Sequence, residues 1–157
     1  MIDLTSSSSF IKMVEQKVSE AKQILKKYNL KVDVDPEDLI SYFQATSPTG
    51  DTTTLNDVLK NLFLLVHELV EINELKKRGL SITKDVIVKN IDTVYNAHLI
   101  ATEVELYIAY KHDALKHIRN RIKNIESWLE DPLLPKGLYN KCYELLKKSK
   151  KWGKVNG

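Results

Sequence analysis

The segment LFLLVHELVEINELKKRG, residues 62–79, decides the fold of this chain of 157 residues. Apolar side chains fill half of its positions and no glycine or proline occurs before Gly79, a pattern that predicts a long helix ending at a left-handed glycine. A second stretch without glycine or proline, residues 84–111, follows after a short connection. Two long helices joined by so short a turn must run antiparallel and side by side, so we predict a central helical hairpin.

Apolar residues recur every three or four positions in the flanking segments as well, and capping residues or prolines separate these segments. The six predicted helices span about residues 10–28, 36–45, 54–78, 84–111, 115–129 and 138–146. The third and fourth of them form the central hairpin, and residues 46–51 break the chain before it. The sequence therefore predicts an all-α, single-domain bundle of about six helices.

The charge of the chain is unevenly distributed. The formal net charge is +3, but lysines are concentrated after residue 140, so we predict a helical bundle domain over residues 1–146 and a basic, flexible tail over residues 147–157. Proteins that bind nucleic acid more often spread lysine and arginine over a whole face, interleaved with aromatic residues. Nucleic-acid binding is therefore not expected.

The sequence also bears on the cellular compartment. Its single cysteine, Cys142, excludes an internal disulfide bond and lies on the apolar stripe of the last predicted helix, where we expect it to be buried. The first residues lack the pattern of a signal peptide, and no stretch approaches the length of about 18 apolar residues that a membrane span requires. A cytoplasmic protein with no membrane association is predicted.

One group of polar residues in the hairpin has the chemistry of a metal site. His67 and Glu71 are one helical turn apart, and aligning the two long helices across Gly79 brings His67 level with Tyr95 and within one turn of His98. We therefore predict His67, Glu71 and His98 as candidate ligands of a divalent metal ion. The neighbouring Glu68 and Tyr95 are the candidate catalytic residues.

A different interpretation of the same helix remains open. His67, Glu71 and Glu74 share their stripe with Lys60 and Arg78, which is also the pattern of a face exposed to solvent. Under this interpretation the polar residues form ordinary surface contacts. Farther from the turn, Glu105 falls level with Lys60, and we expect these two residues to form an ion pair.

Two functions remain as alternatives. The first is a non-catalytic scaffold or protein-interaction module that self-associates or binds a protein partner, because apolar residues occur within the polar sectors of the hairpin: Leu64, Leu75, Ile100 and Tyr107. The second is a small metal-dependent hydrolase or metal-binding protein with its site between the two long helices. Sequence motifs do not choose between them, because the HExxH pattern of zinc proteases and a glycine-rich phosphate loop are both missing.

Overall fold

The computed structural model describes residues 8–47 and 53–156, and every regular element in these ranges is helical. The elements are α1 (Ser8–Lys27), α2 (Pro36–Gln44), α3 (Leu55–Leu59), α4 (Leu62–Lys77), α5 (Val86–Lys89), α6 (Ile91–Lys111), α7 (Leu115–Leu129), a 3₁₀ helix (Lys136–Leu138) and α8 (Tyr139–Trp152). The predicted all-α, single-domain fold is confirmed. Residues 48–52, part of the predicted break before the hairpin, lie outside the described ranges, as do residues 1–7 and 157.

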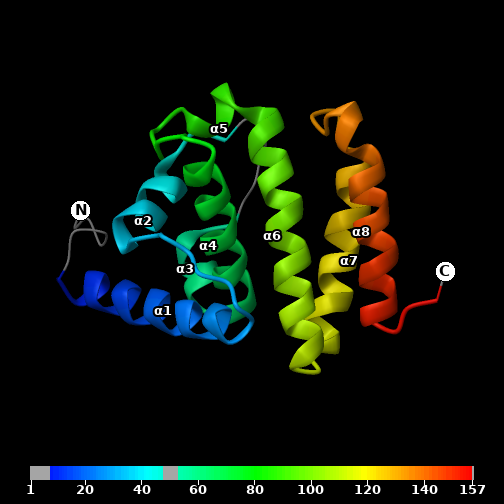
Figure 1. Cartoon of the computed structure of the whole chain (residues 1–157), viewed down its shortest axis with the longest axis horizontal. Coiled ribbons are helices and arrows are strands. Elements are labelled where there is room, and N and C mark those ends of the chain that lie inside the picture. Colours follow the sequence, from blue (N-terminus) through cyan, green and yellow to red (C-terminus); the bar gives the residue numbers. More distant parts are fainter. Residues whose placement is uncertain (1–7, 48–52, 157) are drawn as a thin grey trace.

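Helices α4 and α6 form the centre of the molecule (Figure 1). They pack against each other along their length and run antiparallel, which confirms the predicted hairpin. Helices α1, α2 and α3 pack against α4, whereas α7 and α8 pack against α6 and against each other. Helix α6 is therefore shared by the two halves of the bundle, and it has buried residues that face both of them.

Each of the two long predicted helices is divided at an asparagine. The side chain of Asn61 accepts hydrogen bonds from the backbone N–H groups of Phe63 and Leu64, at 3.0 and 3.2 Å, so it caps α4 and separates it from α3. Asn90 donates from its side chain to the backbone oxygen of Val86 at 2.9 Å and separates α5 from α6. Asparagine competes for backbone hydrogen bonds in this way, which is why the structure has more and shorter helices than predicted.

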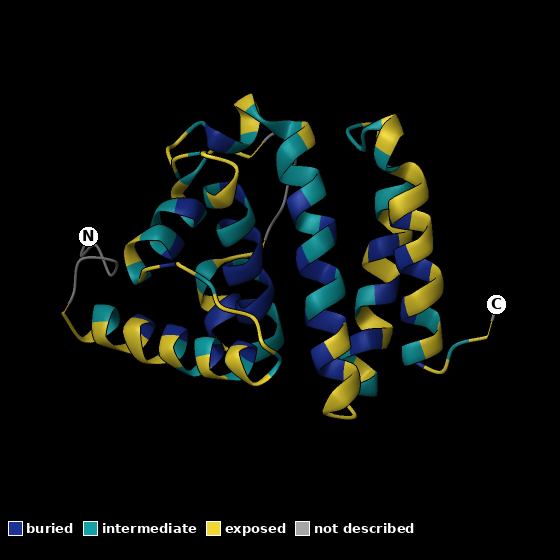
Figure 2. Ribbon diagram, in the orientation of Figure 1, coloured by how far each residue is buried: buried dark blue, intermediate teal, exposed yellow. Residues whose placement is uncertain are grey.

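The buried apolar residues form two clusters, and Figure 2 shows buried residues in both halves of the bundle. The first cluster contains buried residues of the first five α-helices, α1 through α5, and of α6. The second cluster contains buried residues of α6, α7 and α8. Four buried polar residues lie on the two central helices. They are His67 and Glu71 on α4, and Thr102 and Glu105 on α6.

Helix α8 continues to Trp152, past the predicted start of the tail at residue 147. Ser149 is buried, Lys148 forms an ion pair with Glu103 of α6, and the ring of Trp152 stacks on Tyr107.

Cys142 is buried in the second cluster, as predicted, and burial raises the pKa of its thiol to about 11. Across the described ranges, no helix combines the length and the apolar character needed to cross a bilayer.

Candidate metal centre

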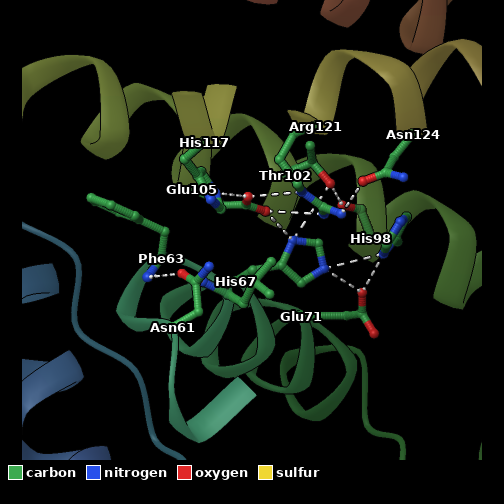
Figure 3. Close-up of polar contacts among 11 residues, drawn as sticks. Asn61, Phe63, His67, Glu71, His98, Thr102, Glu105, His117, Arg121 and Asn124 are labelled. Atoms are coloured by element: carbon green, nitrogen blue, oxygen red, sulfur yellow. Dashed lines mark hydrogen bonds and ion pairs between the residues drawn. The ribbon is translucent and has the colours of Figure 1, made fainter. Parts of the chain in front are cut away.

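Two side chains one turn apart on α4 and a third from α6 converge at the middle of the hairpin (Figure 3). Nε2 of His67 lies 3.2 Å from Oε1 of Glu71 and 3.2 Å from Nδ1 of His98. The same nitrogen of His98 lies 2.8 Å from Oε1 of Glu71. The structure therefore brings together all three residues that were predicted as metal ligands, with two nitrogens and one oxygen forming a small triangle.

The size of this triangle suits a divalent transition-metal ion. Ligand atoms about 2.1 Å from such an ion are about 3.4 Å apart at tetrahedral angles and about 3.0 Å apart at octahedral angles. The three separations here, 2.8, 3.2 and 3.2 Å, bracket the octahedral value and are close to the tetrahedral one. The spacing of the three atoms is therefore compatible with a single divalent ion.

The second ring nitrogen of His67 is held by a buried carboxylate of α6. Nδ1 of His67 donates to Oε1 of Glu105 at 2.9 Å. Metal-binding histidines commonly donate their other N–H group to a carboxylate, which fixes the tautomer and the ring orientation and makes the ligating nitrogen more basic. Glu105 therefore holds His67 in the orientation and tautomer that ligation through Nε2 requires.

Glu105 is fixed in turn by two residues of α7. Arg121 donates from Nε to Oε2 at 2.9 Å and from Nη2 to Oε1 at 3.1 Å, and Nε2 of His117 lies 2.6 Å from Oε2. The burial of Glu105 acts to raise the pKa of its carboxyl, but the charge of Arg121 and the hydrogen bonds from His117 and His67 outweigh burial and hold that pKa below its usual range. Glu105 is therefore ionised at neutral pH.

The same contacts determine the protonation of the three predicted ligands. Burial opposes the charge of His67, but hydrogen bonds to Glu105 and Glu71 outweigh it and raise the pKa of the imidazole to about 10. Burial also opposes the charge of Glu71, yet hydrogen bonds from His67 and His98 hold the pKa of that carboxyl below its usual range. For His98, burial outweighs the hydrogen bond to Glu71 and lowers the pKa of the ring. At neutral pH without metal, His67 is charged and His98 is neutral.

Tyr42 of α2 orients the carboxylate of Glu71. Its hydroxyl, which is buried, donates to Oε2 of Glu71, while Oε1 belongs to the triangle. One oxygen of Glu71 is therefore occupied by the phenol, and the other is directed toward the two imidazoles. This arrangement favours ligation through a single carboxylate oxygen.

The two predicted catalytic residues lie in different cavities, and His98 lines both. Tyr95 lines a cavity of about 330 Å³, and Glu68 lines one of about 290 Å³. The hydroxyl of Tyr95 donates to Oδ2 of Asp131 at 2.8 Å, and burial together with this hydrogen bond raises the pKa of the phenol. The phenol therefore keeps its proton at neutral pH, and the structure does not bring Glu68 and Tyr95 into one site.

Two expectations about this region are wrong. The stripe of α4 that carries His67 and Glu71 is not a solvated face, because α6 packs along it and leaves the two residues only 2% and 5% exposed. Glu105 does not pair with Lys60 but with Arg121. The break at Asn61 explains the second error, since it places Lys60 at the exposed end of α3 rather than on α4.

The residues that the sequence did not reveal come mostly from α7. His117 and Arg121 hold Glu105, and the ring of Trp128 packs against His98 with their centroids 4.4 Å apart. One signal was present, because polar and aromatic residues are spaced by four, three and four beside the apolar stripe of this helix. They are His117, Arg121, Asn124 and Trp128.

Replacing the guanidinium that faces Glu105 tests whether this buried carboxylate needs a cation. We expect Arg121→Met to lower the free energy of unfolding by about 3–5 kcal/mol, because it leaves a buried charge without its partner. The matched control is Arg119→Met on the same helix, which removes a hydrogen bond to the backbone oxygen of Gly153 and should cost about 1 kcal/mol. Urea unfolding of both variants measures the difference, and equal losses would contradict this account of Glu105.

No protein-family model matches this chain. Neither a curated protein nor a solved structure gives a significant match to it.

Proposed function

We propose that this protein binds one divalent transition-metal ion through His67, Glu71 and His98, and that it is a small metal-dependent hydrolase. The observation that carries the proposal is the triangle formed by Nε2 of His67, Oε1 of Glu71 and Nδ1 of His98, with separations of 2.8–3.2 Å. Two histidines and one carboxylate form the ligand set of several catalytic zinc sites and of nonhaem iron sites.

The surroundings of the triangle support a metal ion over a purely structural cluster. Glu105 directs Nε2 of His67 toward the other two ligands, and Tyr42 leaves one oxygen of Glu71 available. Burial favours the neutral ring of His98, and Nδ1 of this ring would bind an ion once the proton that it donates to Glu71 has moved to Nε2. These contacts orient each side chain before an ion arrives, which is the arrangement expected of a preorganised site.

The number of ligands supports a catalytic rather than a structural role for the ion. Structural zinc sites commonly use four protein ligands, whereas catalytic sites use three and keep a position open. Glu71 and His98 line the cavity of about 330 Å³, so a small molecule bound there would be next to that open position. A divalent ion would supply a Lewis acid that activates water or polarises a carbonyl group.

Metal analysis tests the proposed ligand set. We expect protein without a histidine tag, stripped with chelator, to bind one equivalent of Zn²⁺ or Co²⁺, and His98→Ala or Glu71→Gln to lower the affinity at least about 100-fold, because each removes one of three ligands. Isothermal titration calorimetry and the visible spectrum of the Co²⁺ form measure this. The control is His112→Ala, which alters an exposed histidine outside the triangle and should bind like the original protein.

Three results would contradict the metal proposal. They are no binding to the original protein, equal binding by the His98→Ala and His112→Ala variants, or a Co²⁺ spectrum that is the same in both.

The pH dependence of binding follows from the protonation of His67. Because its pKa is about 10, the ring is protonated at neutral pH and must lose one proton before Nε2 can bind metal. The apparent affinity should therefore rise with pH, by about tenfold per unit between pH 6 and 8, with one proton released per ion. Calorimetry in buffers of different ionisation enthalpy counts that proton, and binding without proton release would contradict the assignment of His67.

The scaffold that self-associates remains a second candidate. Tyr107 and Tyr110 of α6 are partly exposed, as are Tyr139 and Tyr143 of α8, and exposed tyrosines are common at interfaces between proteins. Leu75 no longer supports this candidate because it is buried in the core. Light scattering at micromolar concentration tests it: a dimer or larger species is expected, and a strict monomer would count against self-association.

A further inference from the structure

The cavity beside the candidate metal centre has a distinctive lining, and we call it the aromatic cavity. Three aromatic side chains contribute to its wall, Tyr42, Tyr95 and Trp128, together with aliphatic side chains of α5 and α6. Its volume of about 330 Å³ is at the lower end of the range for small-molecule sites. The aromatic cavity therefore has room for a compact ligand with an apolar body.

The charges around the aromatic cavity favour one sign of ligand. Glu71 and Asp131 line it, and none of the described lining residues is a lysine or an arginine. Glu71 pairs with the charged imidazole of His67 and also accepts from His98. Asp131, in contrast, forms no ion pair with a lysine or arginine of the described residues. A ligand with a negative charge would be repelled by the two carboxylates. A cation would be attracted by the carboxylate of Asp131, which has no cationic partner among the described residues.

The carboxylate of Asp131 is held in place for such a contact. Its Oδ2 accepts from the hydroxyl of Tyr95 at 2.8 Å, and its Oδ1 accepts from the backbone N–H of Leu133 at 2.9 Å. Two neutral donors fix the carboxylate without neutralising its charge. The aromatic rings beside it add a second attraction, because the face of an aromatic ring attracts cations.

From this lining we infer that the aromatic cavity binds a small organic cation, an ammonium group on an apolar body, with the ammonium group at Asp131. Tyr95, which donates to Asp131, is one turn before His98 on α6, and the ring centroids of Tyr95 and His98 are 6.2 Å apart. An amine bound at Asp131 would therefore share its cavity with Glu71 and His98, two of the candidate metal ligands. The inference names small organic amines as the substrate class of the proposed hydrolase. Their role as substrates rests on the proposed function, whereas the binding of the cation does not.

A matched set of probes tests the preference for a cation. The probes are 2-phenylethylammonium, trimethyl(2-phenylethyl)ammonium, 2-phenylethanol and 3-phenylpropionate, which share an apolar body and differ in charge. We expect both ammonium ions to bind about tenfold more tightly than the alcohol, with the propionate weakest, because an ionic contact to Asp131 adds to the shared apolar contacts. Calorimetry at pH 7 measures all four, and the trimethyl compound excludes ligation of a metal by nitrogen.

Two variants locate the effect. Asp131→Asn keeps an oxygen acceptor but removes the charge, and it should reduce the preference for the ammonium ions to within about threefold. The control is Asp92→Asn, an exposed carboxylate on α6 outside the lining, which should leave the preference unchanged. Equal binding of ammonium and alcohol, tighter binding of propionate, no binding by any probe, or an unaltered preference in Asp131→Asn would each overturn the inference.

Measurements with and without metal separate this inference from the proposed function. Selective binding of the ammonium probes by a protein that binds no metal would support the cation site and remove the hydrolase. One equivalent of bound metal without any preference among the probes would support the metal centre and rule out the cation site. The comparison of probes on the original protein also needs no variant, so a variant that fails to fold does not weaken the test.

Discussion

The structure depends on one buried carboxylate. Glu105 is fully buried at the point where α4, α6 and α7 meet. Its carboxylate accepts hydrogen bonds from Arg121, His117 and His67. An isolated charge in that position would be very unfavourable, so the folded structure requires these hydrogen-bond donors around the carboxylate. The same contacts that stabilise Glu105 also orient the His67 ring that faces Glu71 and His98. Stability and the candidate chemistry of this protein therefore share a single set of hydrogen bonds.

The fold was largely predictable from the spacing of apolar residues and from the caps. Residues 54–78 and 84–111 were predicted to form an antiparallel hairpin, and α4 and α6, which lie within these ranges, do so. What periodicity could not reveal was the interruption at Asn61 and Asn90, because a side chain that competes for backbone hydrogen bonds leaves the apolar pattern intact. The end of α8 was missed for a related reason, since the lysines after residue 146 hide a buried serine and a stacked tryptophan.

The candidate site was predictable only where it depends on the hairpin. Aligning two helices across a short turn was enough to bring His67, Glu71 and His98 together, because their positions follow from the helical rise and the turn at Gly79. The contributions of Arg121 and Trp128 depend on how α7 returns against α6, and no local pattern fixes that packing. The polar stripe of α7 beside its apolar stripe indicated a half-buried face. The sequence could not identify the residues of α6 that this face contacts.

The two helices that hold Glu105 and its guanidinium partner belong to one side of the bundle, α6 and α7. Glu105 faces α7, so docking of α7 onto the hairpin of α4 and α6 both removes this carboxylate from water and supplies the guanidinium of Arg121. The helix that buries the charge is therefore also the helix that balances it. Arg121 thus ties the half of the bundle formed by α7 and α8 to the central hairpin by charge, although the apolar contacts alone would divide the molecule into two clusters.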